Sequence, residues 1–266
     1  MSEENDAVLT ERRGRVLLIT LNRPDAMNAI NGDLSEGLVA AIEELDTDND
    51  LSSAVLTGNG RGFCSGMDLK AFAKGENIGP FLEFIRAGSK KPLIGAVEGF
   101  ALAGGLEMAL TCDLLVASEG AKLGISEVKV GLFAAGGGLQ RLPSRVGYGT
   151  AMKMALTGDP ILAEEASEKG LVMEVTEKGG AVDAALALAE RIARNAPLAL
   201  AASKQLIAAA VDRTADEFFE FQNTFMTVFV SNDAQEGPKA FAEKLSLIHI
   251  SEPTRLNSTS RMPSSA

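Results

Sequence analysis

Short apolar runs alternate with segments of helical periodicity along the first two thirds of the chain. Such runs predict strands, which we expect at Arg15–Leu21, Ser53–Thr57, Leu93–Val97, Leu114–Ala117 and Leu171–Val175. Apolar residues recur at helical spacing over 34–45, behind Asp33, which can cap that helix. A second helix is expected from about Gly104 to Thr111. Strands that alternate with helices predict parallel βα units with right-handed crossovers, and therefore an α/β fold.

The pattern is mostly helical from Gly136 to Lys244. We expect helices at Ala181–Ala193, at Leu198–Val211 and near Phe218–Phe229, the last two separated at Asp212 and Arg213. The sequence therefore predicts an α/β core over residues 1–195 and a helical oligomerisation region over residues 196–244.

The final segment, Leu245–Ala266, is rich in Ser, Thr and Pro and has no helical periodicity. Its first part, Leu245–Arg255, resembles the translated end of a transposase sequencing adapter, so we interpret residues 245–266 as a non-native tail. The tail holds the only histidine, His249. Without histidine, Ser-His-Asp and Cys-His mechanisms are excluded, and proton transfer near neutral pH falls to carboxylates, Lys, Cys or Tyr.

The composition of this chain of 266 residues limits the classes of partner that it is expected to bind. Its formal charge of -11 disfavours nucleic acid and anionic lipid. The two cysteines, Cys64 and Cys112, form no CxxC or Cys/His cluster, so no metal site is expected. Few cysteines, a polar N-terminus and no apolar run of membrane-spanning length favour a cytoplasmic protein.

The segment VEGFALAGGLEMALTCD places glycines where a predicted strand leads into a helix. The first N–H groups of a helix lack internal partners, so the N–H of Gly104 could bind an anion or a developing oxyanion. Glu107 lies one turn later, on about the same side as Gly104. The alternative is that the glycines only ease helix packing and that Glu107 is a favourable acid in a first turn.

A second glycine-rich turn, GNGRGFCSGMDLKAF, could present another free N–H near Met67. It lacks the G-K-[ST] ending of a nucleotide-binding loop. Asp68 could serve only as a helix cap. Two N–H groups from separate loops are what an oxyanion hole requires, and each such hydrogen bond contributes about 3–4 kcal/mol of transition-state stabilisation.

A third segment, KLGISEVKVGLFAAGGGLQRL, contains a carboxylate in a rather apolar stretch. Glu127 could have a raised pKa there and act as a proton donor. The alternative is a surface acid paired with Lys129. The GGGLQ run does not match a dinucleotide-binding fingerprint.

The order and spacing of these segments resemble the enoyl-CoA hydratase/isomerase (crotonase) family across residues 8–244. The similar segments are LITLNRPDAMNAI, GFCSGMDLKAF, VEGFALAGGLEMALTCDLLVAS, GLQRLPSRVG, LTGDPILAEEASEKGLV and EGPKAFAEK. The resemblance implies a crotonase-like fold, with a core of ββα units and parallel sheets and a helical C-terminal region. It also implies trimers that pair into hexamers.

For the site, the resemblance implies an acyl-CoA thioester whose carbonyl lies between the N–H groups of Met67 and Gly104. Glu107 and Glu127 correspond to the two carboxylates of the family's hydratases. Glu107 would deprotonate water, and Glu127 would deliver a proton to C2 in a syn addition. The implied reaction needs no metal or redox cofactor, because CoA is part of the substrate.

The resemblance also implies a CoA site and an acyl pocket. The expected CoA contacts are Arg23, Ala29, Met67, Asp68, Leu69, Lys70 and Gly104. Phe72 and the segment Ile78–Ile85 are expected to shape the acyl end. The chain departs from the family at Ala134 and Ala135, where relatives commonly carry Pro and then Gly or Asp.

Two alternatives to 2-enoyl-CoA hydration remain open within the family, carnitinyl-CoA dehydration and 3,2-enoyl-CoA isomerisation. GMDLKAF and EGPKAFAEK are similar to segments of the carnitinyl-CoA dehydratases. A third alternative is a non-catalytic CoA-binding or RNA-binding protein. The negative charge and the retention of both glutamates disfavour it.

Overall fold

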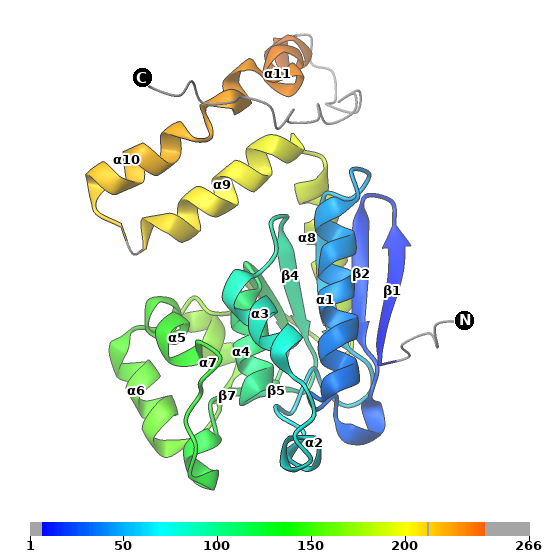
Figure 1. Cartoon of the computed structure of the whole chain (residues 1–266), viewed down its shortest axis with the longest axis vertical. Helices are drawn as coiled ribbons and strands as arrows, with labels where there is room; N and C mark the ends of the chain where they lie inside the picture. Colours follow the sequence, from blue (N-terminus) through cyan, green and yellow to red (C-terminus); the bar gives the residue numbers. More distant parts are fainter. Residues whose placement is uncertain (1–6, 212, 243–266) are drawn as a thin grey trace, which may run out of the picture. The chain divides into compact units, whose positions relative to one another are not determined.

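A six-stranded sheet with one antiparallel edge organises the N-terminal unit of the chain (Figure 1). The computed structural model describes residues 7–211 and 213–242, and the chain divides into two compact units, Met1–Ala193 and Arg194–Ala266. The sheet has the order β1-β2-β3-β4-β6-β9, in which β1 is antiparallel to β2 and every other pair is parallel. Its strands are β1 (Val8–Arg13), β2 (Val16–Leu21), β3 (Ser53–Gly58), β4 (Leu93–Val97), β6 (Leu114–Ser118) and β9 (Glu174–Thr176).

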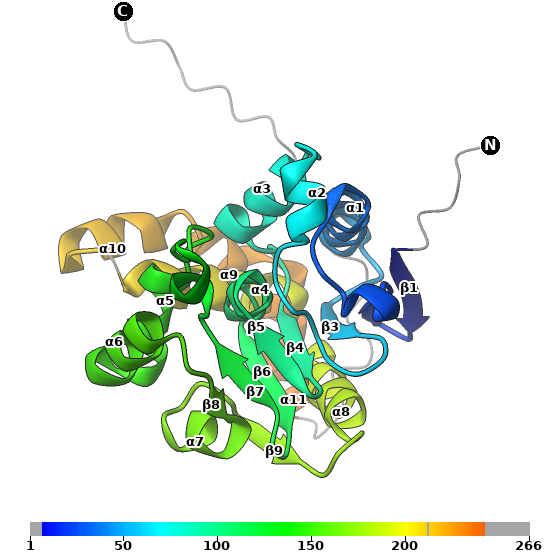
Figure 2. The same cartoon turned by 90° about the horizontal axis from the view of Figure 1, so that it is seen from below.

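The central strands β3, β4 and β6 are buried along almost their whole length because helices cover both faces of the sheet. On one face, Val55, Ile94 and Val116 pack against α8 (Ala181–Ala193), whose buried alanines recur every four residues and allow close approach. Figure 2 shows α8 and α4 on opposite sides of β4 and β6. The remaining helical segments of this unit are η1 (Pro24–Ala26), α1 (Gly32–Thr47), α2 (Leu69–Ala73), α3 (Gly79–Ala87), α4 (Gly104–Thr111), η2 (Glu127–Val130), α5 (Gly138–Val146), α6 (Tyr148–Thr157) and α7 (Ala163–Glu168).

A smaller sheet of three strands lies beside the large one and leads into the site. It has the order β5-β7-β8, formed by Phe100–Leu102, Lys122–Gly124 and Ile161–Leu162. β5 runs parallel to β7 and directly precedes α4. The small sheet therefore fixes where α4 begins.

Most of the predicted elements are confirmed, two predictions in this unit are wrong in detail, and one strand was missed. The strand expected at Leu171–Val175 pairs only over Glu174–Thr176, because Leu171 is buried in the core ahead of the strand. The cap of α1 is Asn31, whose side chain accepts the N–H of Leu34, and Asp33 lies inside the first turn. β1 was not predicted, since it is an edge strand whose last five residues are exposed.

The C-terminal unit is helical. It contains α9 (Pro197–Ala210), α10 (Ala215–Asn223), the 3-10 helix η3 (Met226–Val230) and α11 (Asn232–Ala242). The single helix expected near Phe218–Phe229 is thus two segments, and Thr214 begins the first with a capping box to Glu217. The predicted break at Asp212, the tail Leu245–Ala266 and His249 lie outside the described residues.

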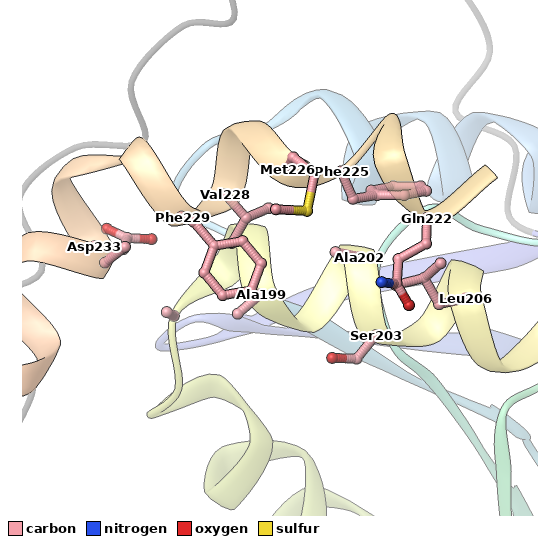
Figure 3. Close-up of a pocket in the computed structure, with 12 residues that line it drawn as sticks. Ala199, Ala202, Ser203, Leu206, Gln222, Phe225, Met226, Val228, Phe229 and Asp233 are labelled. Atoms are coloured by element: carbon pink, nitrogen blue, oxygen red, sulfur yellow. The ribbon is translucent and has the colours of Figure 1, made fainter. Parts of the chain in front are cut away.

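The C-terminal unit also holds an apolar pocket of about 480 Å³ (Figure 3). Its walls include Leu206, Phe225 and Phe229, with Ser203 and Gln222 among the polar residues. None of the residues predicted for the site lines it. No helix in the described part of the chain is long and apolar enough to cross a membrane.

Candidate active site

The loop that carries Met67 is held between β5 and the turn before α1. Phe63 donates its N–H to the carbonyl of Phe100, and Cys64 accepts the N–H of Leu102 at 3.0 Å. On the other side, Ile30 donates to Gly66 at 2.8 Å and accepts from Asp68 at 2.9 Å. Met67 is bracketed by these two bonds, so its peptide is fixed by the backbone on both sides.

The second loop places Gly104 at the start of α4. Ala103 precedes it with a φ of 50° and a ψ of -127°, a conformation that non-glycine residues rarely adopt. The N–H of Ala103 donates to Gly124 in β7 at 2.8 Å, which holds this strained residue in place. At Gly105 a Cβ would collide with the carbonyl of Cys64, so a glycine is needed for α4 to lie against the first loop.

The two loops bring Met67 and Gly104 together, as the sequence predicts. A Cβ built on Gly66 would lie 3.3 Å from the nitrogen of Gly104, and one built on Gly104 would lie 3.8 Å from the nitrogen of Met67. Among the hydrogen bonds of the described residues, no protein acceptor takes the N–H of Met67 or of Gly104. A carbonyl oxygen placed here could accept both.

Glu107 lies one turn into α4 and is almost completely buried, with 5% of its surface exposed. Its Oε1 accepts the N–H of Gly138 at 2.9 Å. Burial is the main cause that raises the pKa of Glu107; the N–H of Gly138 opposes it, and the negative charge of Glu127 raises the pKa further. The two predicted carboxylates are therefore close enough to interact.

Glu127 begins η2 and is half-buried. Its Oε2 is buried and has no hydrogen-bond partner among the described residues. Burial raises the pKa of Glu127 and exceeds the effect of nearby backbone N–H groups. The alternative pairing with Lys129 is wrong, because Lys129 binds Asp159 at 2.7 Å.

This arrangement can perform acid–base chemistry on a polarised carbonyl compound. Two carboxylates whose pKa values are raised by burial are suited to give and take protons. Two N–H groups without protein acceptors can stabilise a developing oxyanion next to them. Within the described residues, no group of three or more His, Cys, Asp or Glu could hold a metal ion.

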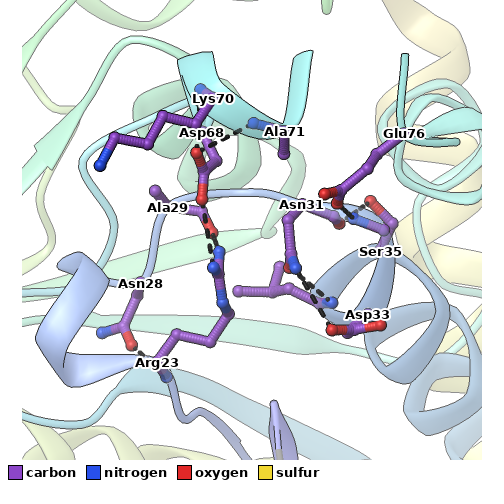
Figure 4. A network of polar contacts seen from close by, with 12 residues as sticks. Arg23, Asn28, Ala29, Asn31, Asp33, Ser35, Asp68, Lys70, Ala71 and Glu76 are labelled. Atoms are coloured by element: carbon purple, nitrogen blue, oxygen red, sulfur yellow. Dashed lines mark hydrogen bonds and ion pairs between the residues drawn. The ribbon is translucent and has the colours of Figure 1, made fainter. Parts of the chain in front are cut away.

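Of the residues predicted to contact CoA, Arg23, Ala29 and Asp68 lie in one network of polar contacts (Figure 4). Arg23 donates to the carbonyl of Ala29 and forms an ion pair with Asp68 at 3.1 Å, which joins the two loops. Asp68 also caps α2 by accepting the N–H groups of Lys70 and Ala71, as the alternative for this residue predicts. Leu69, by contrast, is exposed at the start of α2.

Electrostatics around Asp68 favour its charged form. Desolvation opposes ionisation, but the N–H of Ala71 and the guanidinium of Arg23 outweigh it and lower the pKa of Asp68. Lys70 is exposed, and its side chain points away from Asp68 (Figure 4). The structure thus joins Arg23, Ala29 and Asp68 into one network and leaves the Leu69 and Lys70 side chains at the surface.

The expected acyl-side residues are divided between the surface and the core. Phe72 is exposed on α2. In α3, Phe81, Phe84 and Ile85 are buried. Ala134, one of the two departures from the family pattern, is buried as well.

Sequence reasoning missed the residues that hold Glu107. A Cβ on Gly136 would lie 2.7 Å from Oε2 of Glu107, and one on Gly138 would lie 3.1 Å from Oε1. Arg141 follows one turn later and donates to the carbonyl of Ile85 at 2.5 Å. The run of three glycines was the available signal, because glycine permits such close approach of backbone to a side chain.

Known proteins similar to this chain share both its sequence and its fold. The sequence profile of the enoyl-CoA hydratase/isomerase family matches residues 11–249. An enoyl-CoA hydratase of Mycobacterium tuberculosis (EchA19) is 41% identical over 91% of this chain and 96% of its own length. A 2,3-dehydroadipyl-CoA hydratase of Escherichia coli is 38% identical over 89% of this chain and 96% of its own.

A solved structure gives the same result for the fold. The crystal structure of an enoyl-CoA hydratase (EchA1) from Mycobacterium marinum matches with a TM-score of 0.87 at 50% identity. The match covers 91% of this chain and 97% of that one. The predicted crotonase-like α/β fold is therefore confirmed.

Proposed function

Because the chain belongs to the enoyl-CoA hydratase/isomerase family and is an enzyme of that family, we propose that it adds water reversibly to a 2-enoyl-CoA thioester with Glu107 and Glu127 as its acid and base. The observation that carries this proposal is the state of the two carboxylates. Glu107 is buried and anchored by Gly138, while Oε2 of Glu127 is buried without a partner among the described residues. A buried carboxylate oxygen that lacks a partner is available to a substrate proton.

The thioester carbonyl oxygen would accept hydrogen bonds from the N–H groups of Met67 and Gly104. These bonds draw electron density from the conjugated double bond, so C3 becomes electrophilic. The same two donors stabilise the enolate oxygen that forms when the nucleophile adds. Ala103 supports this role because its positive φ orients the peptide that carries the N–H of Gly104.

Glu107 would accept a proton from water as the water oxygen bonds to C3. Glu127 would then give a proton to C2, and the electron pair of the enolate forms the new C–H bond. In the reverse direction Glu127 removes the C2 proton and Glu107 protonates the leaving hydroxyl. Both carboxylates act from one side of the substrate, which gives a syn addition.

The reaction so proposed consists of proton transfers and one C–O bond, so no metal or redox group takes part. CoA would enter as part of the substrate. We place its contacts at the network of Arg23, Ala29 and Asp68 and at the neighbouring Leu69 and Lys70. The pairing of Arg23 with Asp68 supports a role in shaping this wall.

Assembly into a homotrimer or homohexamer is part of the same proposal. Exposed apolar side chains on the C-terminal unit, Ile207, Phe229 and Val230 among them, support it because such residues favour burial against another chain. The cytoplasm is the proposed compartment, supported by the free thiols of Cys64 and Cys112.

Parallel assays with crotonyl-CoA, crotonobetainyl-CoA and a 3-enoyl-CoA test the reaction. We expect turnover of crotonyl-CoA with the appearance of 3-hydroxybutyryl-CoA. Turnover of crotonobetainyl-CoA alone would indicate a carnitinyl-CoA dehydratase. Turnover of the 3-enoyl-CoA alone would indicate an isomerase. Binding of acyl-CoA without turnover of any of the three would indicate a non-catalytic protein.

A further inference from the structure

Arg141 joins two parts of the site that are distant in sequence. Its Nη2 donates to the carbonyl of Ile85, in the last turn of α3, at 2.5 Å. Its Nη1 faces the carbonyl of Gly136 at 3.4 Å. The carbonyls of a last helical turn have no partner within the helix, and Arg141 supplies one for Ile85.

The turn that Arg141 contacts is the one that holds the Glu107 carboxylate. Gly138 donates to Oε1 of Glu107 at 2.9 Å, and Gly136 lies against Oε2. Between them, Gly137 has a φ of 90°, and a Cβ there would collide with the guanidinium of Arg141. The guanidinium thus lies close to the backbone of this turn, where the glycine at 137 leaves room for it.

We propose that Arg141 is a positioning residue for Glu107, because it ties the turn Gly136–Gly138 to the end of α3 and so fixes the carboxylate that the turn binds. The inference rests on the proposed function, in which Glu107 acts on water. A fixed carboxylate matters because a displacement of about 1 Å at a reacting group can lower the rate on the order of 100-fold. Arg141 also connects α3, the helix expected to border the acyl group, to the turn that holds Glu107, the proposed base.

Charge adds a second consequence. The charged groups that act on Glu107 are Glu127 from η2, which raises its pKa, and Arg141 from α5, which lowers it. The group of α3 that contacts Arg141 is the carbonyl of Ile85, which carries no charge. Loss of the Arg141 charge should therefore leave Glu107 with a still higher pKa, and the acidic limb of the rate profile should move to higher pH.

Three variants separate position from charge. Arg141→Met removes both the forked donor and the charge, and Arg141→Lys keeps the charge without the fork. Arg145→Met is the matched control: Arg145 lies on the same helix and is similarly half-buried, but it donates to the carbonyls of Cys112 and Asp113 at the far end of α4. Circular dichroism and thermal melting establish that each variant is folded.

The readouts are kcat, KM and the pH profile with crotonyl-CoA, together with a carbon-13 NMR titration of the Glu107 carboxyl, assigned with Glu107→Gln. Arg141→Met should lower kcat roughly 10-fold to 100-fold, with little change in KM, and raise the titration midpoint. Arg141→Lys should lower kcat but leave the midpoint near that of the wild type. Arg145→Met should change neither.

Several outcomes would overturn the inference. One is a folded Arg141→Met with wild-type kcat and an unmoved midpoint, and another is an equal effect of Arg145→Met. If Arg141→Met does not fold, a wild-type kcat in Arg141→Lys rejects the role of the fork. If the wild-type enzyme turns over no enoyl-CoA, the proposed function fails, whereas the NMR titration still decides whether Arg141 controls Glu107.

Discussion

Lys129 donates from Nζ to Oδ1 of Asp159 at 2.7 Å, so the lysine nearest to Glu127 in the sequence is held by another carboxylate. Glu127 keeps a buried oxygen, Oε2, that has no hydrogen-bond partner among the residues that the structure describes. The ion pair of Lys129 therefore does not involve Glu127, the carboxylate that we propose as the proton donor.

The first prediction concerns the two carboxylates. Glu107→Gln and Glu127→Gln should each lower kcat for crotonyl-CoA hydration by at least about 100-fold, because each removes a proton-transfer group. The double variant should be far less impaired than the product of the two effects, since the groups act as a unit. Steady-state kinetics with all three variants measure this.

The matched control for Glu127 is Lys129→Met. It breaks the exposed ion pair with Asp159 and leaves the Glu127 side chain intact. We expect kcat within about twofold of the wild type and little change in Tm, since exposed ion pairs contribute little to stability. A loss of activity comparable to that of Glu127→Gln would show that Lys129 serves the reaction.

Stability should depend on pH through Glu107. Its pKa is raised, chiefly by burial, so the charged form opposes folding. Below the ordinary glutamate pKa of about 4.3 the carboxyl is protonated in both states and this cost is absent. As pH rises through the raised pKa, the wild type loses stability that Glu107→Gln retains.

Urea unfolding of both proteins between pH 4 and pH 8 measures the effect. We expect Glu107→Gln to be the more stable protein at neutral pH and the difference to close toward pH 4. Each tenfold difference between the acid dissociation constants of Glu107 in the folded and unfolded states corresponds to about 1.4 kcal/mol of stability. A difference that is constant with pH would show that packing and not ionisation separates the two proteins.

Backbone contact between the loops that carry Met67 and Gly104 gives a third prediction. Gly105→Ala should destabilise the protein by at least about 2 kcal/mol, because the new Cβ would meet the carbonyl of Cys64 and neither backbone can move freely. The control is Gly149→Ala in α6, where no atom lies within 4 Å of an added Cβ. There, in the first turn of the helix, the same substitution should leave the stability unchanged or raise it by less than about 1 kcal/mol. Thermal and urea unfolding compare the two.

The two roles of Asp68 can be separated by a fourth pair of variants. Asp68→Asn keeps an acceptor for the cap of α2 but removes the charge that pairs with Arg23, whereas Asp68→Ala removes both. The alanine variant should be about 1 kcal/mol less stable than the asparagine variant, which is the usual contribution of a cap. If the pair with Arg23 shapes the CoA wall, KM should rise in both to a similar extent.

Elements with one strong local signal could be predicted from the sequence. α4 has its predicted bounds, Gly104–Thr111, because two glycines and a long apolar run mark its start and its burial. β4 and α8 also match their predicted ranges. β1 carries little such signal, since its last five residues are exposed and its pairing with β2 places it in the sheet.

The candidate site was predictable where motif and spacing were local and not where contacts join distant segments. Glu107, Glu127, Met67 and Gly104 lie within or beside glycine-rich motifs. Arg141 contacts Ile85, a residue 56 positions earlier, through a backbone carbonyl that is the same in every amino acid. The types of the two residues therefore do not predict this contact, which can be found only from the fold.

The N–H donors proposed for the substrate, those of Met67 and Gly104, and the N–H of Gly138 that holds Glu107 are all peptide groups. Every amino acid except proline supplies such a group. A missense change therefore cannot delete these donors, except by introducing proline. It can only push them aside by adding atoms. Random mutagenesis should consequently find many of its inactivating changes at the codons of glycines such as Gly66 and Gly105, which supply no group to the proposed reaction.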